Sequence, residues 1–238
     1  MPSSERKIKE AVKNINKIMQ KQILSILKRM TVLFVVVTAM QTMSGQTNAP
    51  LVFIKAPASV LPTIDKNTRL DMVDYFKGGM TTSSTTSLNG EVRVTSMTDK
   101  QIEFTTSENG RMLISPVKYG RDTVIVVVKT ADIPVSDSRV ELYSWPKWNI
   151  IDSRDCGVIS DWITSSAQKE NLLDEIENTL GFMTASATFD PETATITFKP
   201  TISDIISESE YSKVSPYIHR EITMKVRAGK GIVPDKRK

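Results

Sequence analysis

Asp71 and Asp74 lie three residues apart on a predicted helix, so their carboxylates share one face of that helix. Paired carboxylates can bind calcium or carry out general acid–base chemistry. Acidic residues on a helix surface more often pair with neighbouring cations, here Arg69 and Lys77. We therefore interpret the two aspartates as structural, and we retain Arg69, Asp71, Asp74 and Tyr75 as a candidate binding surface.

The side chains that could act as nucleophiles are Ser138, which follows Asp137, and the only cysteine, Cys156. The only histidine, His219, stands just before a predicted strand, where a surface histidine is the ordinary expectation. A single histidine excludes histidine-cluster metal sites and leaves any Ser–His or Cys–His pair dependent on that one residue. No segment resembles a nucleophile elbow, a cysteine-hydrolase signature or a phosphate-binding glycine loop. We expect no catalytic residue, no metal and no cofactor, and we retain Asp137 and Ser138 as candidate binding residues.

Three tryptophans, Trp145, Trp148 and Trp162, fall near the ends of predicted segments. Tryptophan in such places anchors a core or forms a platform for a sugar or a partner protein. Core anchoring is the more common role, and Trp148 is retained as a candidate binding residue. The lone cysteine is expected to be buried and inert, because free cysteine is among the most buried residue types.

The elements that must position these residues change character along the chain. Leu51–Ile54 is a brief apolar run, interpreted as a first strand or as the segment packed against it. A short helix is predicted over 69–77, ended by Gly78 and Gly79. Alternating strands follow, each with one apolar and one wetted face, over residues 91–95, 101–105, 111–114 and 138–143. Residues 123–128 are apolar on both faces, which predicts a central strand that is covered on both sides.

The C-terminal part contains a predicted helix over 165–180, followed by Gly181. Residues 185–189 and 193–198 form a predicted hairpin, a short helix is expected over 207–214 and a strand over 222–226. The tail from Ala228 is charged and expected to be frayed. These patterns predict an α+β fold, an antiparallel β-meander sheet with a few peripheral helices, with an all-β fold as the alternative. We divide the chain into 1–45, a β-meander region over 46–150, and a second α+β region over 151–238 that shares a core with the first.

The N-terminal part has the layout of a secretory signal peptide. The basic pair Lys28–Arg29 precedes an apolar run that extends to Met40 and is followed by small polar residues. The run is too short to cross a bilayer, which takes about 20 apolar residues. We expect cleavage at Gly45–Gln46, a periplasmic or extracellular protein, and contact with the membrane only during export.

The residues before this run form a basic amphipathic helix by their spacing, with apolar side chains at Ile8, Val12, Ile15, Met19, Ile23 and Ile26. One explanation is a misassigned start, since Met19 or Met30 would each open a more ordinary signal peptide. A membrane-surface helix or an organelle presequence is the alternative.

The positive charge of the chain belongs to the signal segment. The whole sequence has 31 basic and 27 acidic residues, and residues 46–238 hold 23 and 25 of these. A folded domain with this balance lacks the basic surface on which nucleic-acid binding depends. We expect no nucleic-acid partner.

The segment Arg69–Phe76, preceded by Leu61–Pro62 and Asn67, resembles a family of exported proteins from Bacteroides-type Gram-negative bacteria that is known only as a domain of unknown function. The resemblance continues through Leu88–Gly90, the valine-rich strand, Pro134, Asp137–Val140, Tyr143 and Trp148, and covers about Phe53 to Val226. It implies an exported envelope or secreted protein and supplies no activity, ligand or catalytic residue.

Together, these observations favour a non-catalytic binding or assembly module of the cell envelope, with an unknown protein or glycan partner. The alternative function is a hydrolase with an unfamiliar site. Such a site would be built from Asp71, Asp74, Asp137 and Ser138, or from Cys156 and His219, and it would require these groups to converge in one pocket.

Overall fold

The computed structural model of the chain describes residues 47–169 and 171–235, which belong to one compact unit, Thr47–Lys238. The predicted signal peptide, the amphipathic stretch before it and the cleavage point at Gly45–Gln46 lie outside the described residues. No helix within the described ranges combines the length and the apolar character that crossing a bilayer requires.

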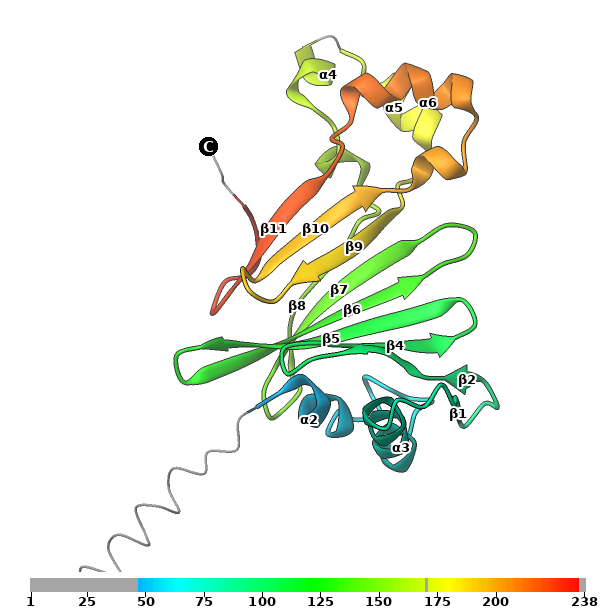
Figure 1. Cartoon of the computed structure of the whole chain (residues 1–238). Coiled ribbons are helices and arrows are strands. Elements are labelled where there is room, and N and C mark those ends of the chain that lie inside the picture. The colour runs from blue at the N-terminus through cyan, green and yellow to red at the C-terminus, as the bar shows by residue number, and fades with distance from the viewer. Residues whose placement is uncertain (1–46, 170, 236–238) are drawn as a thin grey trace, which may run out of the picture. The chain divides into compact units, whose positions relative to one another are not determined.

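The strands of the described ranges form three sheets, and the helices lie around them (Figure 1). The helical elements are α2 (Ala49–Ile54), α3 (Lys66–Lys77), η1 (Ile159–Asp161), α4 (Ser165–Lys169), α5 (Leu173–Leu180), η2 (Ile202–Asp204), α6 (Glu208–Val214) and η3 (Ser215–Tyr217). The strands are β1 (Ser84–Thr85), β2 (Glu91–Val92), β3 (Val94–Met97), β4 (Ile102–Ser107), β5 (Gly110–Tyr119), β6 (Asp122–Ala131), β7 (Asp137–Ser144), β8 (Ile150–Asp155), β9 (Ala185–Asp190), β10 (Thr195–Pro200), β11 (Ile222–Arg227) and β12 (Gly231–Pro234).

The six-stranded sheet is an antiparallel meander in which strands β3 to β8 follow one another in sequence order. The four-stranded sheet has the order β12-β11-β10-β9 and is antiparallel throughout, and β1 pairs with β2. Glu108 and Asn109 connect β4 to β5, and Gly110 is the first residue of β5, so a hairpin forms where the Asn109–Gly110 dipeptide predicts one. The structure therefore confirms the predicted α+β class with an antiparallel meander.

Strand β6 is the centre of the fold because both of its faces are buried. Ten residues of β5 face ten of β6, and β7 pairs along the other side of β6. Val124, Val126 and Val128 point to one face, and Ile125 and Val127 point to the other. The double coverage predicted from the apolar run over 123–128 is confirmed.

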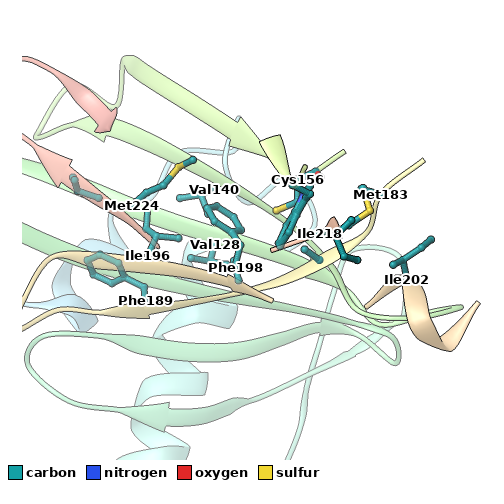
Figure 2. Close-up of a cluster of buried hydrophobic side chains, with 14 of the residues drawn as sticks. Val128, Val140, Cys156, Met183, Phe189, Ile196, Phe198, Ile202, Ile218 and Met224 are labelled. Carbon is teal, nitrogen blue, oxygen red and sulfur yellow. Dashed lines mark hydrogen bonds between the residues drawn. The ribbon is translucent and has the colours of Figure 1, made fainter. Parts of the chain in front are cut away.

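The core between the two large sheets, which we call the inter-sheet core, is shown in Figure 2. Val128 and Val140 of the six-stranded sheet pack toward Phe189, Ile196 and Phe198 of the four-stranded sheet. The core continues toward α5 and α6, where Trp162 is almost fully buried and its indole Nε1 donates to the Cys156 carbonyl. Trp162 therefore anchors a core, and Cys156 is buried as the sequence predicts.

The opposite face of the six-stranded sheet carries a second core under α2 and α3, the helix-side core. Phe53 of α2 packs against Phe104 of β4 with ring centroids 4.6 Å apart. Helix α2 begins because the Asn48 side chain accepts from Leu51 N, and α3 begins because Asp65 accepts from Asn67 N and Thr68 N. The expectation of one wetted face is therefore wrong for β5 and β7, the neighbours of β6, since helices and a second sheet cover their two faces.

The edge strand β9 of the small sheet is closed by side chains of β7. Asp137 Oδ1 accepts a hydrogen bond from Ala185 N at 3.2 Å, and Ser138 Oγ accepts one from Ala187 N at 2.9 Å. Ser138 Oγ also shares a hydrogen bond of 2.9 Å with Thr130 Oγ1 of β6. A row of unpaired amides on an edge strand is a site for unwanted pairing. These contacts, the β9 clasp, satisfy two amides of that row and fix the small sheet on the large one.

The other edge strand, β12, is held in a similar way. Asp152 Oδ2 of β8 accepts from Ile232 N at 2.7 Å. The neighbouring Gly231 has a φ of +72°, and a Cβ at this position would collide with the Asp152 carboxylate. Glycine is therefore required at this position both for its backbone conformation and for the close approach of the carboxylate.

Three sequence-based expectations need correction, and one strand has no counterpart among the predictions. Of the two interpretations of Leu51–Ile54, the strand is wrong, because Asn48 and Pro50 start helix α2 there. The segment instead packs against the sheet, on β4 and β5. The helix expected over 165–180 is divided into α4 and α5, and Asn171, with a φ of +55°, lies between them. The tail from Ala228 is not frayed over Gly231–Pro234, which forms β12. Strand β8, with alternating polar residues, was not expected.

Replacing Ser138 with alanine should destabilise the protein by about 1–3 kcal/mol, because it leaves the buried Ala187 N–H without an acceptor. Urea unfolding at equilibrium measures this change, and Ser203→Ala, at an exposed position in η2, is the matched control. A Ser138→Ala variant as stable as the control variant would show that the β9 clasp contributes nothing.

Candidate functional site

An open groove of about 750 Å³ lies where the ends of several strands meet the loop 60–64. The groove is lined by residues 60–64, 106, 107, 109–112, 129–131 and 137–139, and by Asp155. Its volume falls in the range of small-ligand sites. The floor includes the buried side chains of Leu61, Ile64 and Met112, and charged side chains of both signs lie around it.

The loop 60–64 is held in place by hydrogen bonds at both of its ends. Val60 N and Leu61 N donate to the Pro57 carbonyl, at 3.0 and 3.1 Å. Arg69 of α3 is only 5% exposed, and its Nη1 donates to the Ile64 carbonyl at 3.1 Å. Burial lowers the pKa of Arg69 and the charge of Asp65 partly offsets this, but an arginine stays protonated in proteins. Arg69 therefore holds the loop 60–64, which forms one wall of the groove, from the side of α3.

Charged residues of neighbouring strands form a cluster beside the groove, to whose lining Lys129 and Arg139 contribute. Lys129 of β6 lies directly opposite Arg139 of β7, and like charges in that position repel. Glu141 of β7, 7% exposed, lies between them: its Oε2 is 2.7 Å from Lys129 Nζ and its Oε1 is 3.3 Å from Arg139 Nε. The Tyr143 hydroxyl donates to the same carboxylate. We call these four residues the Glu141 cluster.

The electrostatics of the Glu141 cluster follow from this geometry. Burial alone would raise the pKa of Glu141, but hydrogen bonds from Lys129 and Tyr143 and the charges of Lys129 and Arg139 outweigh it, so the pKa is lowered. Burial, together with the hydrogen bond to Glu141, raises the pKa of Tyr143. At neutral pH the cluster therefore holds a carboxylate, two cations and a neutral phenol.

The structure brings together some of the residues singled out in the sequence and separates others. Asp137 and Ser138 line the groove, and Arg69 supports its wall. Asp71 and Asp74 are exposed on α3 and do not line the groove. Two further candidates lie at other places. Tyr75 lines a different pocket, and Trp148 packs against Tyr143 and Trp145, with centroids 5.6 and 6.1 Å away.

The groups proposed for a hydrolase are engaged in structural contacts. Ser138 is only 3% exposed, and its Oγ is hydrogen-bonded to Ala187 N and Thr130 Oγ1. The Cys156 thiol donates to the Ser138 carbonyl at 3.6 Å, while His219 is exposed. Burial raises the pKa of Cys156, and the carboxylates of Asp137 and Asp155 raise it further. A thiol in these surroundings is a poor nucleophile. Neither arrangement favours hydrolysis.

Lys129 and Glu141 are site residues that the sequence analysis did not identify. The signal was present, because each places a charge at a position of a strand that faces a core. The sequence does not say that these two residues are neighbours. The β6–β7 register does, because it pairs Lys129 with Arg139 and Val127 with Glu141, which makes Lys129 and Glu141 diagonal neighbours on one face. Among the described ranges, no group of three or more His, Cys, Asp and Glu side chains could hold a metal ion.

The fold has three layers, which are helices α2 and α3, the six-stranded sheet and the four-stranded sheet. This fold and its groove are found here in a member of a family without an assigned activity. The sequence model of the family described as "Protein of unknown function (DUF3256)" matches residues 39–230, and the chain belongs to that family. A solved structure, described as a domain of an uncharacterized protein from Porphyromonas gingivalis W83, is similar with a TM-score of 0.63 and 20% sequence identity. The match covers 80% of this chain and 100% of that one, and at this identity it shows the fold alone. No curated protein matches the sequence.

Replacing Glu141 with glutamine should destabilise the protein at pH 7 by about 1–3 kcal/mol, because two cations and a phenol lose an ionised acceptor. The lowered pKa of Glu141 means that this contribution is present above the ordinary glutamate value of about 4.3 and is lost as the pH falls through the lower folded value. Urea unfolding between pH 7 and pH 3 should show the difference shrinking on acidification.

Glu177→Gln, at an exposed position of α5, is the control and should show a much smaller difference. A stability difference for Glu141→Gln that is the same at pH 7 and pH 3 would contradict the ion pairing in the Glu141 cluster.

Proposed function

We propose that the protein is exported to the cell envelope or beyond and acts as a non-catalytic binding module, whose groove receives a polypeptide segment of a partner protein. The observation that carries the proposal is the groove itself, since it combines an apolar floor with charged side chains of both signs. Burial of apolar surface supplies affinity and fixed charges supply specificity for one partner.

Support for export comes from the sequence before the described residues. A basic pair, an apolar run and small polar residues in that order are the parts of a signal peptide. The buried, unreactive Cys156 is compatible with an oxidising compartment, because it offers no accessible thiol to an intermolecular bridge.

The groove favours a polypeptide over a glycan as the partner. Sugar sites commonly use an exposed aromatic ring on which the sugar stacks. Here Trp148 is half-buried against Tyr143, Trp145 is half-buried beside Trp148, and neither lines the groove. The groove instead presents Arg111, Lys129 and Arg139 near Asp137 and Asp155. A chain with side chains of both charges complements such a surface.

Site-specific photo-crosslinking in the natural host tests the proposal. The photoreactive residue p-benzoylphenylalanine is placed at Ser107 or Asn109 in the groove, or at the exposed Ser212 of α6 as the control position. We expect one protease-sensitive adduct of the same mass from both groove positions and none from Ser212. Asp155→Arg should remove this adduct, and the matched Asp204→Arg change in η2 should not.

The exported form is checked in the same experiment by sequencing its N-terminus, which we expect to begin at Gln46. A chain that begins at Met1 and fractionates with the cytosol would contradict export. Adducts of equal yield from Ser212, or an adduct that resists protease and is cleaved by periodate, would contradict a polypeptide partner.

A further inference from the structure

A second pocket, which we call the α3 pocket, lies between the C-terminal end of α3 and strand β3 and has a volume of about 520 Å³. It shares no lining residue with the groove. It includes Tyr75, a candidate binding residue by its place on the predicted helix, which does not line the groove.

The wall of the α3 pocket is shaped by the way in which α3 ends. Gly79 N donates to the Phe76 carbonyl at 3.0 Å and Met80 N donates to the Tyr75 carbonyl at 2.9 Å, with Gly79 at a φ of +68°. This is the Schellman arrangement, in which the residue after the glycine meets the residue five positions before it. The turn therefore brings Met80 back toward Tyr75 at the pocket.

The body of the α3 pocket is apolar. Met72 and Val94 are buried beneath it, Tyr75 and Phe76 are half-buried, and Met80 is 57% exposed. Leaving an apolar side chain of this size in water gains nothing for the fold, and a ligand that covers Met80 removes that surface from water.

One charged side chain, Arg93, lines the α3 pocket. Its backbone is fixed by Thr105, because Arg93 N donates to Thr105 Oγ1 and the Arg93 carbonyl accepts from Thr105 N, both at 3.0 Å. The Arg93 side chain is exposed, and within the described ranges no ion pair or side-chain hydrogen bond involves its guanidinium. An arginine presents several donors in a planar fork that matches a carboxylate.

The C-terminal end of α3 does not repel an anion that binds in the α3 pocket. The C-terminal carbonyls of a helix carry partial negative charge when they are unpaired. Here the carbonyls of Asp74, Tyr75 and Phe76 accept hydrogen bonds from Gly78, Met80 and Gly79. The unpaired charge facing the α3 pocket is therefore that of Arg93.

We propose that the α3 pocket binds an amphipathic carboxylate of the medium-chain fatty-acid type. Its hydrocarbon chain lies against Met72, Phe76 and Met80, and its carboxylate pairs with Arg93. The shape of the pocket provides the apolar contact and the single positive charge selects an acid over a neutral molecule of the same length.

The proposal is tested with residues 47–238, since both cores are built within this unit and the apolar run of the signal peptide would itself bind fatty acids. Octanoate and 1-octanol are titrated while the methionine methyl signals are followed by NMR. We expect octanoate to shift the Met72 and Met80 methyl signals and to leave that of Met112, in the groove, unchanged.

Arg93→Gln should weaken octanoate binding by about 10-fold or more, since it removes a charged hydrogen bond, and should leave 1-octanol binding unchanged. Arg121→Gln, in the exposed turn between β5 and β6, is the matched control and should change neither. Equal affinity for the acid and the alcohol, an unchanged affinity in Arg93→Gln, or no shift at Met80 would each overturn the proposal. None of these outcomes bears on the groove.

Discussion

The burial of both faces of β6 determines most of the architecture. Val124, Val126 and Val128 require an apolar cover on one face, and Ile125 and Val127 require another on the opposite face. A strand with this pattern is stable only in the middle of a layered fold. The four-stranded sheet supplies one cover and the helices α2 and α3 supply the other (Figure 1).

The need to cover both faces of β6 also determines where polar groups are found, since they lie at the edges of the covering layers. Stacking a second sheet on the first leaves edge amides facing the larger sheet, and Asp137, Ser138 and Asp152 accept from them. On the helix side, α2 contacts β4 and β5, and α3 contacts β3. The charged ends of β6 and β7 remain beside the groove, where Glu141 neutralises the repulsion between Lys129 and Arg139. The groove thus lies where the apolar cover ends.

Local sequence signals were sufficient for the elements whose pattern is strong. The apolar run of β6 predicts a central strand, and the Asn109–Gly110 dipeptide predicts the β4–β5 hairpin. The Asp65 cap explains why α3 starts at Lys66, three residues before the predicted start. Short or polar segments were harder. Leu51–Ile54 has an apolar run too short to separate a strand from a helix, and β8 and β12 owe their form to pairing with β7 and β11.

The candidate site was predictable only in part, because its residues meet through register. Asp137 and Ser138 were identified as polar residues worth attention, but the structure uses both to close β9. Lys129 and Glu141 come from different strands and become diagonal neighbours through the β6–β7 pairing, which no local pattern specifies. Arg93 and Met80 likewise approach each other only after α3 and β3 have packed.

Amide hydrogen exchange on residues 47–238 gives the most direct test of whether the two sheets form one cooperative unit around β6. We expect the amides of Ala185 and Ala187, which donate to β7 side chains, to have the same opening free energy as the amides of Val126 and Val127. That free energy should equal the free energy of global unfolding. If the amides of β9 to β12 exchange through a lower-energy opening while those of β5 to β7 stay protected, the two sheets do not form one cooperative unit.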